Sequence, residues 1–351
     1  MNVELLESCD HRAAALWRSL EATNTSFFLS YGWMEHWLAA LPRSHAPVLA
    51  VFRDGDAAIA AGMFGRRRVV RHHVVPSRAW FLHATGDSRF DDICVEHNGL
   101  IGARIPLAAL VSALPDGWDE LVLSAIDRDA FGVPMAEGVR VHVDREVASP
   151  YVDLQRVRDT SGGYLGVLGA ATRAQIRRSR RALGELTVEI ASDTHHALDI
   201  FRELIELHQR AWALRGESGA FADPWFRTFH ETLIEQRPRE VELIRVRANG
   251  HTVGCLYNFV YRGRVLFYQS GLAHFDDPHI KPGLVAHAAA IANAAARGEA
   301  IYDFLGGDGR YKHNLATGQT VLRWLRIQQP RVRFAVEDRL REWKHALARV
   351  P

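Results

Sequence analysis

The spacing of hydrophobic and polar residues predicts mixed helices and strands in the first part of the chain. Apolar positions recur at helical intervals in residues 31–40, where Trp33 and Trp37 fall on one face. Two apolar runs, 48–52 and 57–64, are separated by Arg-Asp-Gly-Asp, a sequence typical of a β-hairpin turn. The remaining elements expected here are helices at 12–22 and 107–114 and strands at 69–75, 79–83, 120–124 and 139–143.

The second part begins with a polar, glycine-containing stretch, 151–169, that we interpret as a bridge between domains. A basic helix is expected at 172–183, followed by a strand at 186–190. In the next helix, 197–214, apolar residues repeat at intervals of four, three and four. Asp223-Pro224 then predicts another helix, with Asp at its cap and Pro in its first turn.

Three β runs follow in close succession, at 241–247, 252–261 and 265–270. Asn-Gly and Arg-Gly between them predict tight turns and therefore an antiparallel meander. The elements expected after the meander are a helix at 283–297, strands at 300–304 and 321–328, and a charged amphipathic helix at 332–350.

Both halves share the order meander, helix, strand, which predicts a duplicated α/β unit. We expect α/β (α+β) domains whose mostly antiparallel sheets are flanked by helices. The first domain is placed at 1–150, the second at 151–330 and a terminal helix at 331–351.

Composition narrows the function classes. The 351 residues are 48% hydrophobic and 24% charged, which is typical of globular proteins. A net charge of +2 is too balanced for a protein whose main partner is DNA or an anionic membrane. The longest apolar runs do not reach the length of a membrane span. The three cysteines (Cys9, Cys94 and Cys255) are far apart and fit a reducing compartment, so the expected location is the cytoplasm.

The stretch from 241 to 314 carries the most specific signal. Pro282-Gly283-Leu284, Asp303-Phe304, Gly307 and Tyr311-Lys312 occur there in an order that resembles GNAT-related acetyltransferases. The family in question includes the cellulose-biosynthesis-associated acetyltransferase-like proteins, and the basic helix and the HQRAW run at 208–212 fit it as well. The chain also resembles, more widely, the Fem-type peptidoglycan aminoacyl transferases, which carry two GNAT folds in tandem.

The resemblance implies that acyl-CoA is the co-substrate. Gly283 opens a helix after Pro282, and the free N–H groups and positive dipole end of a helix favour an anion such as the coenzyme A pyrophosphate. Lys281 adds a charge there, although the usual Gly-rich phosphate loop is absent. The residues expected to bind the donor are Gln269, Ser270, Gly271, Lys281, Pro282, Gly283 and Leu284.

Four residues are candidates for the chemistry. The resemblance implies that Tyr311 protonates the leaving thiolate. His208 has a side chain suited to deprotonating an amine. Asp303 is an alternative base, or it orients Lys312 or caps the glycine loop. Lys312 holds the acceptor or an acyl oxygen, or else forms a surface ion pair.

The sequence signals for acceptor-binding residues are less specific. Arg177 and Arg181 on the basic helix are expected to grip a phosphate or carboxylate, unless that helix presents only a solvated basic face. Trp212 and Tyr257 complete the expected substrate-binding residues. No metal is expected, because His274, Asp276, Asp277 and His279 lie on a loop without the pairing of a metal-binding helix.

We therefore expect an acyl-CoA-dependent N-acyltransferase acting on a small-molecule or peptide amine by direct attack. A backbone N–H near 269–271 would stabilise the oxyanion. An O-acyltransferase acting on a sugar hydroxyl is a variant. Two other classes stay open: a Fem-like transferase that uses aminoacyl-tRNA, and a non-catalytic GNAT-fold binding protein.

Overall fold

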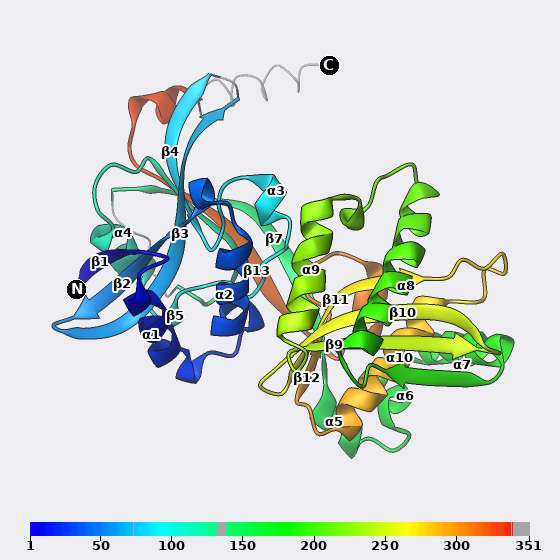
Figure 1. Ribbon diagram of the computed structural model, residues 1–351. Coiled ribbons are helices and arrows are strands. Elements are labelled where there is room, and N and C mark those ends of the chain that lie inside the picture. Colours follow the sequence, from blue (N-terminus) through cyan, green and yellow to red (C-terminus); the bar gives the residue numbers. More distant parts are fainter. Residues whose placement is uncertain (73, 132–137, 338, 340–351) are drawn as a thin grey trace. The chain divides into compact units, whose positions relative to one another are not determined.

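The first unit is built around a three-strand antiparallel meander. The computed structural model describes residues 1–72, 74–131, 138–337 and 339 of the chain (Figure 1). The first of its two units comprises Met1–Glu146 with Leu322–Pro351. Its elements are β1 (Asn2–Glu7), α1 (His11–Leu20), η1 (Glu21–Thr23), η2 (Phe27–Leu29), α2 (Tyr31–Ala40), η3 (Arg43–His45), β2 (Val48–Asp54), β3 (Ala57–Arg71), β4 (Val75–Leu82), α3 (Ser88–Asp91), β5 (Ile101–Gly102), α4 (Leu107–Ala113) and β6 (Glu120–Asp127). Two strands, β7 (Arg140–Asp153) and β13 (Gly318–Gln328), each contribute residues to both units.

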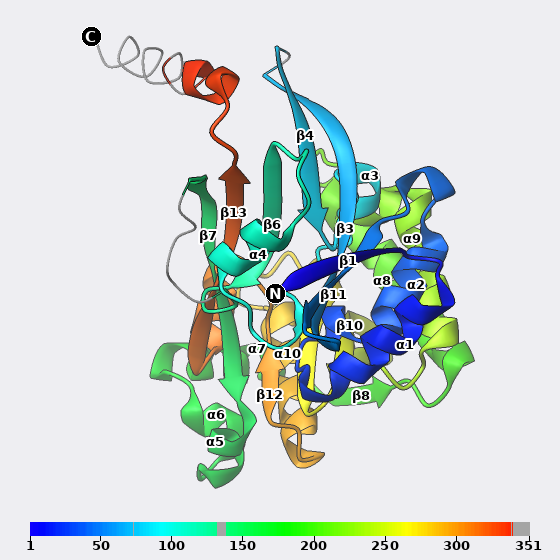
Figure 2. The same cartoon turned by 90° about the vertical axis from the view of Figure 1, so that its left-hand side faces the viewer.

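The strand order in the first unit is β1-β2-β3-β4-β6-β13. β4 pairs with β6 in parallel, at Ala79–Phe81 and Glu120–Val122, and the other neighbours pair antiparallel. Figure 2 shows α1 and α2 on one side of β2–β4 and α4 on the other. Aromatic residues are buried on both sides of these strands. The tryptophans of α1 and α2 are buried on the first side. Phe64 and Trp80 pack with residues of α4 on the second.

The structure of this unit differs from the sequence-based expectations at three points. Residues 69–75 are not a separate strand, because β3 runs unbroken to Arg71 and its arginines pair across β4. β1 was not expected, since its short run carries two glutamates, yet it forms an antiparallel ladder with β2. Residues 322–330 group with this unit and not with the second, because β13 pairs with β6 from Leu322 onward.

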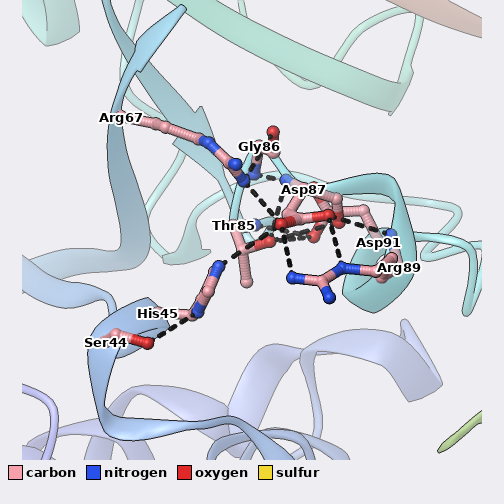
Figure 3. Close-up of polar contacts among 8 residues, drawn as sticks. All are labelled: Ser44, His45, Arg67, Thr85, Gly86, Asp87, Arg89 and Asp91. Carbon is pink, nitrogen blue, oxygen red and sulfur yellow. Dashed lines mark hydrogen bonds and ion pairs between the residues drawn. The ribbon is translucent and has the colours of Figure 1, made fainter.

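An ion-pair cluster in the first unit holds the segment between β4 and α3 (Figure 3). The carboxylate of Asp87 forms ion pairs with Arg67 at 2.8 Å and with Arg89 at 3.3 Å. Hydrogen bonds from these two arginines hold the pKa of Asp87 well below the usual range. Asp91 accepts hydrogen bonds from the backbone N–H groups of Thr85 and Gly86, both at 2.7 Å. The cluster thereby joins β3 to the turn that precedes α3.

The second unit, Val147–Val321, has the strand order β7-β12-β11-β10-β9-β8. Its own elements are α5 (Leu154–Asp159), α6 (Gly163–Val167), α7 (Ala170–Leu183), β8 (Leu186–Ile190), α8 (Thr194–Ala213), η4 (Ala220–Ala222), α9 (Pro224–Gln236), β9 (Val241–Ala248), β10 (His251–Tyr261), β11 (Arg264–Leu272), α10 (Pro282–Ala296), β12 (Ile301–Asp303) and α11 (Arg310–Leu315). The predicted β9–β11 meander is confirmed, as is the helix after Asp223-Pro224.

Helices cover both faces of this second sheet. Alternate side chains of β9–β11 pack with α10 and with α5–α7 in one apolar cluster, whereas Tyr257 and its neighbours pack on α8 and α9. The predicted bridge, 151–169, is instead the end of β7 followed by α5 and α6, because its apolar residues Leu154, Val157 and Tyr164 are buried in this cluster. Of the predicted terminal helix, 332–337 are helical, and most of its remainder lies outside the described residues. The α/β class, with mostly antiparallel strands flanked by helices, is confirmed.

Candidate functional site

The site begins where two parallel strands of the second unit separate. β11 pairs with β12 only through Arg264–Leu266 and Ile301–Asp303. β12 ends at Asp303, whereas β11 continues to Leu272. The last six residues of β11 therefore lie beyond the described β12 ladder, and successive N–H groups along that length point alternately to either edge.

A cavity of about 1550 Å³ opens at this position. Most of the predicted site residues line it: His208, Trp212, Gln269, Ser270, Lys281, Pro282, Gly283, Leu284, Tyr311 and Lys312. The structure thus brings together, on one cavity, residues from α8, β11, α10 and α11 that are up to 104 positions apart in the sequence.

The N-terminus of α10 forms one wall. Pro282 is in the first turn, and Lys281 precedes it without a side-chain cap. Ser179 of α7 is fully buried and fixes the loop before the helix: its hydroxyl donates to the carbonyl oxygen of His279 at 3.0 Å and accepts from the N–H of Lys281 at 3.1 Å. One side chain therefore sets the course of the backbone that leads into the helix.

His208 forms another wall, and its tautomer follows from its neighbour. The amide nitrogen of Gln209 donates to the carbonyl of Ser218 at 2.7 Å, so the amide oxygen faces His208. That oxygen lies 3.1 Å from Nδ1 of His208, and since an amide oxygen only accepts, Nδ1 carries the proton. No described residue bonds Nε2, so its lone pair is left for a ligand. Burial, the largest cause, lowers the pKa of His208, so the neutral ring persists at neutral pH.

The loop after α8 approaches this pair closely. Gly219 has a φ of +70°, and a Cβ there would lie 2.6 Å from the amide oxygen of Gln209 and 3.1 Å from Cε1 of His208. Only glycine fits both the backbone conformation and the space. The loop therefore holds the imidazole and its amide partner in place.

Tyr311 of α11 stacks on a histidine that the sequence did not single out. Its ring lies 5.9 Å from that of His287, at an interplanar angle of 23°. Tyr311 leaves 39% of its surface exposed, yet the partial burial of its hydroxyl raises its pKa to about 12. The phenol therefore keeps its proton at neutral pH and is able to donate it.

The side chain of Lys312 donates to the carbonyl oxygens of Leu305 and Gly306, at 3.2 and 2.8 Å. Asp303 does not line the cavity. Its buried carboxylate accepts from Arg264 at 2.7 Å and from the N–H of Leu305 at 2.8 Å. Of the alternatives for Asp303, these contacts fit the cap of the glycine loop and not the base.

Four other predicted residues lie away from the cavity. Tyr257 is fully buried, and its hydroxyl lies 3.2 Å from Nδ1 of His230. Gly271 packs on α8, since a Cβ there would lie 2.3 Å from the carbonyl oxygen of Leu204. Arg177 and Arg181 are exposed on α7. None of these four lines the cavity, because side-chain direction along a strand or helix decides their positions, and contact of any of them with a ligand stays a prediction.

The first unit closes the equivalent opening. Where β4 and β6 end their parallel pairing, the side-chain amide of Asn98 donates to the carbonyls of Leu82 and Ser124, at 3.2 and 3.0 Å. The N–H of Asn98 donates to Ala125 at 3.0 Å. The two strands of the first unit are thus bridged by protein, whereas in the second unit the cavity borders the part of β11 that lies beyond its pairing with β12.

Sequence reasoning missed Ser179, Gln209 and His287. Gln209 was adjacent to a candidate base, and a search for residues that orient His208 would have found it. Ser179 and His287 act across 100 and 15 positions, and no local pattern marks them.

Within the described residues, no group of three or more His, Cys, Asp or Glu side chains is arranged so that it could hold a metal ion. None of the described helices combines the length and the apolarity needed to cross a membrane.

Comparison with known families and structures agrees with this geometry. Residues 170–313 match the family described as Acetyltransferase (GNAT) domain. No curated protein sequence matches significantly.

Three solved structures are similar across nearly the whole chain. The crystal structure of FemX is 10% identical and has a TM-score of 0.58, covering 92% of this chain and 96% of that one. A conserved protein of unknown function from Bacteroides thetaiotaomicron is 12% identical, with a TM-score of 0.56 and coverage of 90% and 97%. L-PGS from Bacillus licheniformis is 12% identical, with a TM-score of 0.51 and coverage of 93% for each chain. At these identities the likeness concerns the fold alone, and the link to the cellulose-associated family stays a prediction.

Proposed function

We propose that this protein is an acyl-CoA-dependent N-acyltransferase and that its reaction takes place in the cavity of the second unit. The observation that carries the proposal is the separation of β11 from β12 at a cavity that also holds the N-terminus of α10, His208 and Tyr311. The match of residues 170–313 to a GNAT acetyltransferase domain supports it. The proposed acceptor is a small-molecule or peptide amine.

The residues present suit a CoA thioester. The first turn of α10 offers unpaired N–H groups and a positive dipole end, and Lys281 adds a cation, so a pyrophosphate would be held there. The unpaired length of β11 offers backbone donors to an extended pantetheine arm. When bound, the thioester supplies an activated acyl carbonyl.

His208 is the proposed general base. Its Nε2 lone pair accepts a proton from the acceptor ammonium or from the amine as it attacks the acyl carbon. The new C–N bond forms as the C–S bond breaks, and the sulfur leaves with the bonding electron pair. Gln209 holds the imidazole in the required tautomer, so it is a positioning residue.

Tyr311 is the proposed general acid that protonates the departing sulfur. Backbone N–H groups of β11 near Gln269 and Ser270 lie beyond the β12 ladder, and one of them would stabilise the oxyanion. Loss of such a donor costs about 3–4 kcal/mol of transition-state stabilisation in other enzymes. We place the chemistry in the second unit, since Asn98 bridges the corresponding strands of the first.

The proposal is tested with the full chain and a series of donors. Thermal shift against CoA and acyl-CoAs from C2 to C16 is expected to show stabilisation of about 2.7 kcal/mol at 100 times the Kd. Thiol release in the presence of a panel of amines then reports transfer. The chain length with the largest shift identifies the acyl group.

The same measurement separates the rival classes. No shift with any acyl-CoA, combined with salt-sensitive binding of aminoacyl-tRNA, would favour the Fem-like class. Binding of a donor without thiol release for any acceptor would favour a non-catalytic protein. Transfer to sugar hydroxyls in preference to amines would establish O-acylation.

Replacement of Ser179 by Ala is expected to raise the KM for the acyl-CoA about 3–10-fold with little change in kcat. The variant removes both hydrogen bonds that the Ser179 hydroxyl makes to the loop before α10, a loss of roughly 1 kcal/mol per bond. Steady-state kinetics with varied donor measures the effect. Exposed Ser192→Ala is the control, and an unchanged KM in Ser179→Ala would show that the loop holds its course without the hydroxyl.

A further inference from the structure

His287 is a buried histidine that the mechanism above does not use. It lies on α10, one turn after Gly283, and lines the cavity while exposing 2% of its surface. Phe267 of β11 meets its ring edge-on at 4.4 Å and Phe304 at 5.3 Å. Tyr311 stacks on it. Contacts with three aromatic side chains therefore fix the plane of the imidazole ring.

Its tautomer is set by Tyr302. The Nδ1 atom of His287 lies 3.1 Å from the hydroxyl of Tyr302, and both groups are buried. Burial raises the pKa of Tyr302 well above its usual value, so the hydroxyl keeps its proton. That proton has no other acceptor among the described residues. If it points at Nδ1, both groups are satisfied, whereas a proton on Nδ1 would leave the buried O–H without a partner.

The remaining nitrogen, Nε2, then carries the hydrogen. No described residue accepts from it, although the ring borders the cavity. Burial lowers the pKa of His287 to about 3, so the ring stays neutral across the physiological range and does not exchange protons with a substrate. His287 is therefore a rigid, neutral N–H donor in the cavity wall, next to Tyr311.

We propose that His287 is a second hydrogen-bond donor to the thioester end of the acyl donor, and that Tyr302 is a positioning residue that fixes its tautomer. The inference rests on the proposed function and extends it. His287 donates a hydrogen bond from Nε2 to the acyl oxygen or the sulfur and transfers no proton. Its contribution grows as negative charge develops on the bonded atom.

The tautomer is tested first, by nitrogen NMR of the full chain labelled with [15N]histidine. His287→Gln identifies the signals. We expect Nε2 to show the chemical shift of a protonated nitrogen and Nδ1 that of an unprotonated one, unchanged from pH 5.5 to pH 8.5. Addition of CoA or acetyl-CoA is expected to move the Nε2 signal more than Nδ1. A proton on Nδ1, or titration of the ring near neutral pH, would overturn the assignment.

Kinetics of two replacements follow. His287→Phe fills the space without a donor and is expected to reduce kcat about 10–100-fold, while the Kd for CoA changes less than about 3-fold. His287→Gln keeps an N–H donor and is expected to restore part of kcat. His195→Gln, on the exposed start of α8, is the matched control. Circular dichroism and the melting temperature verify that each variant is folded.

Tyr302→Phe serves where the histidine variants do not fold. It is expected to give a mixture of the two tautomers by NMR and a 2–10-fold lower kcat. Wild-type kcat in a folded His287→Phe protein would overturn the role of His287 but not the proposed function. The same holds if Tyr302→Phe keeps a single Nε2–H tautomer of His287 together with full kcat. Absence of transfer by the wild-type chain from any acyl-CoA would overturn the proposed function, and this assignment with it.

Discussion

Replacement of His208 by Ala is expected to reduce kcat/KM by about 10²–10⁴-fold, the usual contribution of a positioned general base. The imidazole is nearly buried on the cavity wall, and Gln209 holds the proton on Nδ1, so Nε2 is left to take a proton from the acceptor. Thiol release at saturating donor measures the effect. His195→Ala, an exposed histidine of the same helix, is the control and is expected to match the wild type.

The pH dependence of kcat/KM gives an independent readout of the same residue. Burial is the largest cause of the lowered pKa of His208, with the hydrogen bond to Gln209 opposing it and the charge of Arg215 adding to it. The active form is the neutral one, so activity is present above this pKa and is lost as the pH falls through it. The wild type is expected to show an acidic limb centred below pH 6.5, and His208→Ala is expected to lack it. A 10²-fold loss that leaves the limb in place would assign the base to another group.

The elements of the second unit follow from local patterns. Asn-Gly and Arg-Gly turns between β-branched and aromatic runs specify the β9–β11 meander, and Asp223-Pro224 specifies the start of α9. Such signals depend on a few neighbouring residues and are therefore visible in the sequence. The resemblance to GNAT proteins then identified the strand-loop-helix connection at which the cavity lies.

Other features depended on pairing partners far along the chain. The assignment of residues 322–328 to the first unit follows from the β13–β6 ladder, whose partners are about 200 residues apart. β1 has little apolar pattern of its own, and the ladder with β2 stabilises it. A polar segment such as Arg66–Arg68 is read as a break in a strand when its cross-strand partner in β4 is unknown.

Side-chain direction limited the site prediction in the same way. Gln269, Ser270 and Gly271 are consecutive, yet only the first two line the cavity, because the third lies against the backbone of α8. Ser179 and His287 became visible only when helices distant in sequence were packed against β11 and its loop. A charged residue near a motif is likewise read as catalytic until its partner is known, as Asp303 illustrates.

Replacement of Asp303 by Ala is expected to lower the free energy of unfolding by about 3 kcal/mol, at the lower end of the range for breaking a buried ion pair. The carboxylate is 1% exposed, whereas 27% of the side chain of its partner Arg264 is accessible. In the variant, hydration of the guanidinium therefore compensates in part for the lost ion pair. The N–H of Leu305 and the hydroxyl of Ser149 also lose an acceptor.

Urea denaturation of the full chain measures this change, with Asp308→Ala, on the exposed part of the same loop, as the control. Asp303→Asn keeps the volume and part of the hydrogen bonding but leaves the guanidinium without its counter-charge. We therefore expect its free energy of unfolding to lie between those of Asp303→Ala and the wild type. Both Asp303 variants are expected to bind CoA with nearly unchanged affinity, since the carboxylate does not line the cavity. A carboxylate that only caps a loop affects turnover through the stability of that loop. A variant that retains wild-type stability but loses turnover 10²-fold or more would therefore contradict the structural role and indicate that Asp303 acts as the base.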